Sequence, residues 1–86
     1  MRLDKFLKVS RIIKRRTIAT SAASSERIMV NGNIAKPSKD IKVGDIITIN
    51  YYKRTMKVRV LIVENNVKAS DAEKMYQVIE IIENEE

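Results

Sequence analysis

The spacing of apolar residues changes from helical to alternating along the chain. Near the start, Leu3, Phe6 and Leu7 recur at intervals of three and four, which predicts a short amphipathic helix over 2–9. A second helix is expected over 17–25, where Thr17 is an acceptable N-cap and several alanines allow close packing. Residues 27–30 then alternate as a strand does.

Short strands joined by turns are expected further along. Asn31-Gly32 is a strong tight-turn signal, Pro37 and Ser38 fall in a loop, and 43–45 marks another turn. The strands predicted around these turns cover 33–35, 46–50 and 56–63, with a basic hairpin tip at 51–54.

The carboxyl-terminal segment combines a helical signal with a strand signal. Ser70 and Glu73 have the spacing of a capping box, which predicts at least one helical turn. Residues 75–82 are rich in β-branched side chains, which favours a closing strand. We therefore predict one α+β domain over 1–86, with two short helices packed on a small, mostly antiparallel sheet. Residues 1–50 would form its core, and 51–86 a β extension with an acidic tail.

Charge is distributed unevenly along the 86 residues, whose net charge is +6. Residues 1–42 hold eleven Lys/Arg against three Asp/Glu, whereas 43–86 hold six against eight. A basic half beside a mildly acidic half is typical of a polyanion-binding face, although a solvated charged surface would look the same.

Catalysis, metal binding and membrane insertion find little support. The chain has no histidine, the commonest general base and metal ligand, and no cysteine for a disulfide or thiolate site. Its carboxylates are scattered and it has no glycine-rich phosphate loop. No apolar run approaches the ~20 residues of a membrane span. We expect a cytoplasmic, non-enzymatic protein without metal or cofactor, monomeric when unbound.

Basic residues surround both predicted helices. Lys14, Arg15 and Arg16 directly precede Thr17, where a helix start already presents unpaired N–H groups and positive potential. Extra cations there are unfavourable unless an anion such as phosphate lies among them, and the alternative is a basic connector without a ligand. The first helix and its end contribute Arg2, Lys5, Lys8 and Arg11.

The type of nucleic acid follows from the remaining composition. Aromatic residues make up only 5% of the chain, too few for a base-stacking platform that binds single strands. The second predicted helix is rich in Ala and Ser, which suits DNA base edges poorly. Structured RNA, recognised through shape and phosphates, is favoured. Asp4, the one acid among the basic residues of the first helix, is expected to orient an arginine, Arg2 or Arg16.

Four short motifs in order resemble the RNA-binding domain family named after ribosomal protein S4. They are RLDKFL at 2–7, R-x-x-A at 16–19, RIMVNG at 27–32 and VGD at 43–45. KPSK at 36–39 and SDAEKMY at 70–76 resemble the ribosome-associated heat-shock branch, and the short length with the acidic end ENEE resembles the compact ribosome quality-control members. The family often has serine in place of Arg15 and glycine in place of Glu26.

The resemblance implies binding of an obstructed large ribosomal subunit through its rRNA and its peptidyl-tRNA. It further implies that the P-site tRNA is stabilised while an RqcH-type tailing factor adds C-terminal alanines to the nascent chain. Arg2 and Arg16 would bind RNA phosphates, Asp4 would fix their geometry, and the matching residues Lys36, Ser38 and Lys39 would join the RNA-binding surface. Alternatives are a heat-shock-type subunit recycling or assembly factor and, from another class, a basic adaptor or membrane-surface binder without a membrane span.

Overall fold

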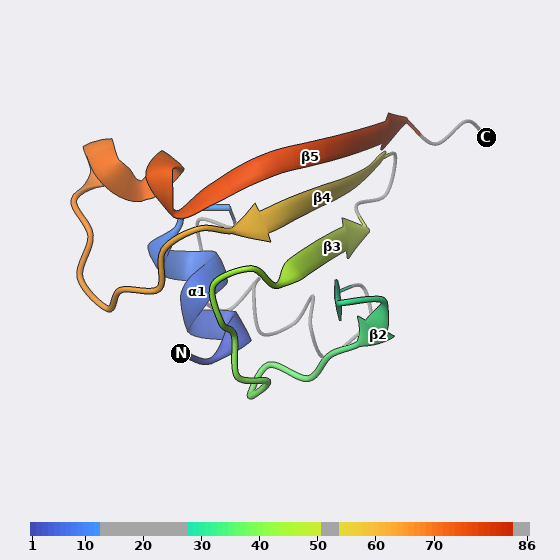
Figure 1. Cartoon of the computed structure of the whole chain (residues 1–86), viewed down its shortest axis with the longest axis horizontal. Coiled ribbons are helices and arrows are strands. Elements are labelled where there is room, and N and C mark those ends of the chain that lie inside the picture. Colours follow the sequence, from blue (N-terminus) through green and yellow to red (C-terminus); the bar gives the residue numbers. More distant parts are fainter. Residues whose placement is uncertain (13–27, 51–53, 84–86) are drawn as a thin grey trace.

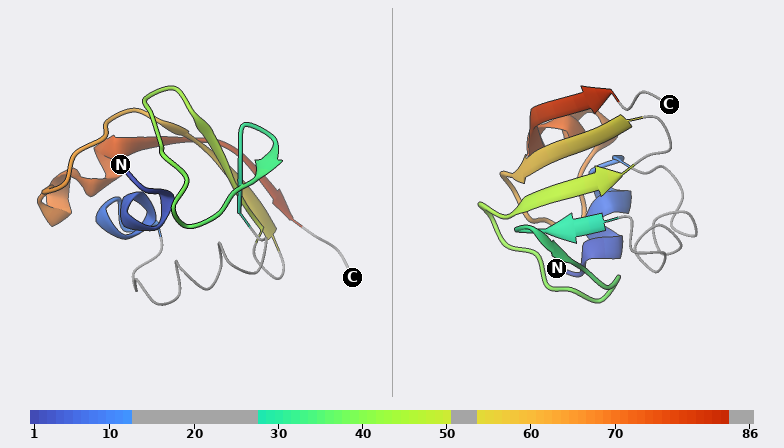
Figure 2. Two further views of the ribbon diagram at one scale, coloured as in Figure 1. Left: turned by 90° about the horizontal axis from the view of Figure 1, so that it is seen from below. Right: turned by 90° about the vertical axis from the view of Figure 1, so that its right-hand side faces the viewer.

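A five-stranded antiparallel sheet carries the helix α1 on one face (Figures 1 and 2). The computed structural model describes residues 1–12, 28–50 and 54–83. In chain order, the elements are α1 (Leu3–Val9), β1 (Ile28–Val30), β2 (Asn33–Ile34), β3 (Ile46–Asn50), β4 (Arg54–Val60), the 3-10 helix η1 (Ala69–Met75) and β5 (Tyr76–Glu83). The strands lie in the order β2-β1-β3-β4-β5, and each neighbouring pair is antiparallel.

Helix α1 forms where the sequence predicts it, because its apolar stripe has a sheet to cover it. Leu3, Phe6 and Leu7 are fully buried. They belong to one core cluster with inward-facing residues of three strands, namely Ile28 and Val30 of β1, Ile47 and Ile49 of β3, and Val58 and Val60 of β4. Burial of a side chain of this size contributes about 1.5–3 kcal/mol. The predicted helix over 2–9 is thus confirmed within one residue.

The β1–β2 hairpin confirms the Asn31-Gly32 turn. Both residues have positive φ, 52° and 84°, as a two-residue type I′ turn requires. The Asn31 side chain also accepts a hydrogen bond from the backbone N–H of Ile46 through Oδ1, at 2.9 Å. Its Nδ2 donates to Asp45 Oδ1 at 3.1 Å. Two of the family-like motifs, at 27–32 and 43–45, are therefore joined by a side-chain hydrogen bond between Asn31 and Asp45.

Strands β3 and β4 confirm the two central predictions with shifted bounds. β3 covers the predicted 46–50, but β4 ends at Val60 and not at residue 63. Beyond it, the N–H groups of Leu61 and Ile62 donate to the carbonyl of Met75, at 2.8 and 3.2 Å. Because these donors are used by the end of η1, the chain leaves the sheet there.

The carboxyl-terminal prediction is right about element types and wrong about the cap. A helical segment does precede a strand, and β5 matches the predicted 75–82 within one residue. However, η1 begins at Ala69 after Lys68, with no side-chain cap, so Ser70 lies inside the helix. The capping box predicted from Ser70 and Glu73 is therefore absent.

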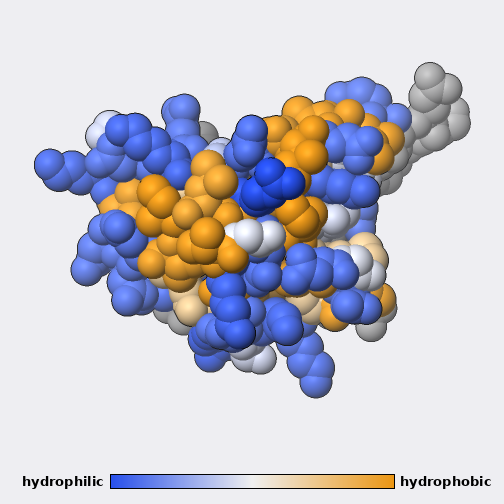
Figure 3. Space-filling model, viewed as in Figure 1, coloured by the Kyte–Doolittle hydropathy of each residue, from blue (hydrophilic) through white to orange (hydrophobic). Residues whose placement is uncertain are grey.

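Strand β5 is an edge of the sheet and carries apolar surface (Figure 3). A bulge beside Lys57 and Val58 leaves Ile79 without a partner on β4. The molecule extends 38 × 22 × 22 Å, with β5 running along its long direction in Figure 1. The predicted second helix at 17–25 and the residues 51–53 of the predicted hairpin tip lie outside the described residues.

Candidate nucleic-acid interface

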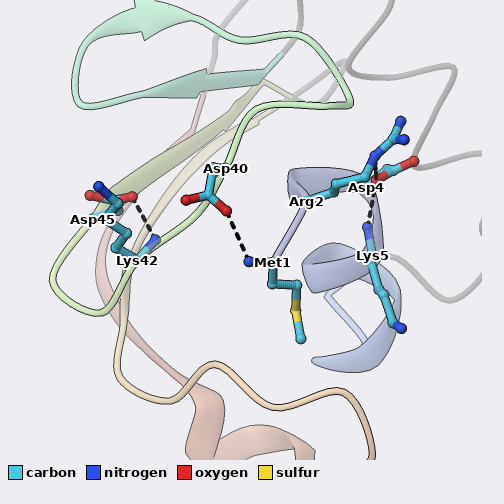
Figure 4. A network of polar contacts seen from close by, with 7 residues as sticks. All are labelled: Met1, Arg2, Asp4, Lys5, Asp40, Lys42 and Asp45. Carbon is cyan, nitrogen blue, oxygen red and sulfur yellow. Dashed lines mark hydrogen bonds and ion pairs between the residues drawn. The ribbon is translucent and has the colours of Figure 1, made fainter.

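The loop before β3 wraps around the start of α1 (Figure 4). The N–H groups of Leu3 and Asp4 donate to the carbonyls of Lys39 and Pro37, at 2.8 and 3.1 Å, and Ile41 donates to the carbonyl of Met1 at 2.7 Å. These bonds occupy the first helical N–H groups that would otherwise attract an anion. Anion binding at this end of α1 must therefore use side chains.

Asp4 is the buried acid of this region and pairs with Arg2. The residue Asp4 is only 4% exposed, and its Oδ1 atom lies 3.4 Å from Arg2 Nε (Figure 4). The same oxygen accepts the backbone N–H of Lys5 at 2.9 Å. The Arg2 side chain remains 62% exposed, so its outer N–H groups face solvent while Nε is held. Of the two arginines expected beside Asp4, Arg2 forms an ion pair with it, and Arg16 lies outside the described residues.

A second carboxylate, Asp40, fixes the amino terminus. The Met1 ammonium donates to Asp40 Oδ1 at 3.0 Å. This hydrogen bond and the positive charge of the ammonium lower the pKa of the Asp40 carboxyl below its usual 3.8. Sequence reasoning missed Asp40, because its partner lies 39 residues away and no local pattern signals the contact.

The outer face of α1 is cationic. Lys5, Lys8 and Arg11 are all exposed, and all three line one groove beside the segment 65–68. Among the residues described, none of the three forms an ion pair within 4.0 Å. Their charges are thus available to a polyanion on this side of the molecule.

The KPSK loop contributes a neighbouring group of polar side chains. Lys36, Ser38 and Lys39 are exposed and line a shallow depression of about 400 Å³ beside the β1–β2 hairpin. The backbone bonds of Pro37 and Lys39 to α1 bring this loop to the end of the helix that carries Arg2. The remaining predicted site residues, Lys14, Arg15, Arg16 and Thr17, lie outside the described residues.

Two further features limit the chemistry of the described part of the chain. No three of its Asp and Glu side chains are grouped so that they could hold a metal ion. None of its helices has the length and apolar character needed to cross a membrane.

Comparison with known proteins identifies the family. The S4 domain matches residues 1–47. Across 92% of the chain and 90% of the relative, the sequence is 51% identical to the RQC P-site tRNA stabilizing factor of Streptococcus pneumoniae. The chain belongs to the S4 domain family, among the RQC P-site tRNA stabilizing factors.

Other relatives agree with this assignment. The RQC P-site tRNA stabilizing factor of Bacillus subtilis is 47% identical, over 92% of each chain. The trimeric structure of Vibrio cholerae Heat Shock Protein 15 superposes with a TM-score of 0.83 at 27% identity, covering 92% of this chain and 81% of that one. The S4-type fold, its antiparallel five-stranded sheet and the relation to the heat-shock branch are thus confirmed.

Proposed function

We propose that this protein is a non-enzymatic, cytoplasmic factor of ribosome quality control. It binds obstructed large ribosomal subunits through rRNA and peptidyl-tRNA and stabilises the P-site tRNA while an RqcH-type factor adds C-terminal alanines. The observation that carries the proposal is the identity of 51% and 47%, over 92% of the chain, with two RQC P-site tRNA stabilizing factors. Off the ribosome we expect a monomer.

The geometry supports a specific role for the amino-terminal residues. Arg2 binds an RNA phosphate through the exposed part of its guanidinium. The ion pair of its Nε with Asp4 limits the orientations that the guanidinium can adopt. Lys5, Lys8 and Arg11 continue the contact along α1, and Lys36, Ser38 and Lys39 continue it from the adjoining loop. Lys14, Arg15, Arg16 and Thr17 complete the proposed RNA-binding set.

The first experiment is recovery of the tagged protein from bacterial cells, with the tag at the carboxyl end because the Met1 ammonium is bonded to Asp40. Bound particles are separated by sedimentation, and their RNA and nascent chains are identified. Large subunits carrying peptidyl-tRNA and alanine-tailed chains are the expected result. Recovery without RNA would refute RNA binding.

A second candidate, subunit recycling or assembly, is favoured by the structural similarity to Heat Shock Protein 15. In the same experiment it predicts vacant or precursor subunits in place of subunits with peptidyl-tRNA. Competition between rRNA and anionic vesicles tests the membrane-surface alternative, because an RNA-binding protein should be displaced from subunits by rRNA and not by the vesicles.

The role of Asp4 can be tested because a positioning role and simple charge attraction predict opposite changes in affinity when its negative charge is removed. Asp4→Asn removes a negative charge next to Arg2, and Glu80→Gln removes one from β5, so each raises the net charge by one. If Asp4 positions Arg2, Asp4→Asn weakens subunit binding about two- to fivefold, which corresponds to the roughly 0.5–1 kcal/mol of a partly exposed ion pair. Equal or tighter binding by both variants would contradict the positioning role.

A further inference from the structure

A basic groove runs between α1 and the segment that follows β4. Its volume is about 890 Å³, and α1 and its end line it with Lys5, Lys8 and Arg11. From the opposite wall come Asn65, Asn66 and Lys68, which lie outside the 1–47 region matched by the S4 domain.

The charged residues that line this groove all have the same sign. Of the eight lining residues, four are cationic, two are amides, two are valines and none is acidic. Clefts lined by one sign of charge concentrate the potential and attract ligands of the opposite charge. Lysine, arginine and asparagine side chains are also the groups that donate to phosphate oxygens in nucleic-acid complexes.

The backbone at Arg11 explains how its side chain comes to line the groove. Arg11 has φ +62°, in the left-handed region that residues with a Cβ seldom adopt. Its N–H is held by the carbonyl of Lys8 at 3.1 Å. The chain therefore turns sharply at the end of α1, and the turn keeps the Arg11 side chain on the groove with those of Lys5 and Lys8. A left-handed residue directly after the last turn is a common way for a helix to end, and here it places Arg11 beside the groove.

We propose that this groove is an additional RNA-backbone site, in which Asn66 and Lys68 bind phosphates opposite the lysines of α1. The inference rests on the proposed function and extends it, because it carries the RNA contact beyond the S4 domain onto the segment 65–68. One strand of structured RNA then lies between two walls of the groove and not on a single helical face.

Two lysines of equal charge provide a matched test. Lys68 lies on the groove, whereas Lys74 lies on η1 and pairs with Asp71 at 3.2 Å. Lys68→Gln and Lys74→Gln each remove one positive charge. We measure the Kd of the full chain for purified large subunits carrying P-site peptidyl-tRNA, between 50 and 200 mM salt, with Asn66→Ala and Arg2→Ala in parallel.

We expect Lys68→Gln to weaken binding about three- to tenfold and to reduce the slope of log K against log salt by about 0.7–0.9, the loss of one phosphate contact. Asn66→Ala should weaken binding with little change of slope, because an amide is neutral, and Lys74→Gln should stay within about twofold of the unmodified chain. If Lys68→Gln binds as tightly as Lys74→Gln while Arg2→Ala binds weakly, the groove proposal fails and the proposed function stands. If the unmodified chain does not bind these subunits, the proposed function itself fails.

A crosslinking experiment identifies what occupies the groove. The chain contains no cysteine, so Asn66→Cys offers a single attachment point for a photoreactive group, and Ile82→Cys on β5 serves as the control. Crosslinks from position 66 to RNA on the large subunit, absent from position 82, support the proposal. Crosslinks from position 66 to protein alone would overturn it.

Discussion

Helix α1 and strand β5 are similar in length, seven and eight residues, yet the fold uses their apolar side chains in opposite ways. The three large apolar residues at the inner face of α1 are fully buried, whereas Val78, Ile79, Ile81 and Ile82 of β5 remain 42–51% exposed. α1 lies across the sheet, but β5 has a neighbour on one side only and is interrupted by a bulge. The apolar content of a segment therefore does not reveal how much that segment stabilises the protein.

The same two segments differ in what happens to their charges. On α1 and directly after it, the exposed cations Lys5, Lys8 and Arg11 lack ion-pair partners among the residues described, while on β5 Glu80 pairs with Lys57 at 3.4 Å. A charge already paired within the protein is less available to a ligand. α1 thus combines the larger share of stability with the unpaired charge that suits binding.

The largest expected difference concerns stability. Phe6→Ala should lower the free energy of unfolding by about 3–5 kcal/mol, because it removes a fully buried ring and leaves a cavity. Ile81→Ala, at a position 51% exposed, should cost at most about 1 kcal/mol. Urea denaturation followed by circular dichroism measures both, and equal costs would contradict the comparison of α1 with β5.

The next contrast concerns binding. The double variant Lys5→Gln/Lys8→Gln should reduce affinity for large subunits about ten- to hundredfold and lower the salt slope by about 1.4–1.8, as expected for two lost phosphate contacts. The control Lys57→Gln/Lys74→Gln removes the same charge from residues that pair with Glu80 and Asp71. A similar loss from the control would show that net charge, and not the face of α1, decides binding.

A smaller effect is expected from the contact that anchors α1 at its start. Because the ammonium of Met1 lowers the pKa of Asp40 below 3.8, the folded state binds this proton less readily than the unfolded state does. The stabilisation is therefore present above pH 3.8 and is lost as the pH falls through the lowered value. NMR titration of the Asp40 carboxyl should give a midpoint below 3.8, and acetylation of the amino terminus should raise it. An unchanged midpoint after acetylation would exclude the contact in solution.

The smallest effect is expected on β5. Lys57 and Glu80 are about half exposed and face each other across β4 and β5. A double-mutant cycle with Lys57→Gln and Glu80→Gln should give a coupling of at most about 0.5 kcal/mol, weakened further by salt. A coupling above about 1 kcal/mol would mean that β5 is held by more than its backbone pairing and apolar contacts.

Local patterns in the sequence were sufficient for most of the described elements. The spacing of Leu3, Phe6 and Leu7 predicts α1, and alternation predicts β1 and β3, because these periods follow from the geometry of a single segment. Asn31-Gly32 predicts its hairpin since the turn needs positive φ at both positions. The capping box at Ser70 failed because the same residues also fit the interior of a short 3-10 helix.

Contacts between distant segments were decided by the tertiary structure. The sequence indicated that Asp4 would orient an arginine, but only the folded chain buries Asp4 beside Arg2 and bonds the 36–41 loop to the start of α1. Likewise, Lys68 lies sixty residues from Lys8 in the chain, and both line one groove because of the path that the chain takes after β4. Periodicity reports which face of a segment is buried. Which other segment meets that face depends on the order of the strands and on the loops between them.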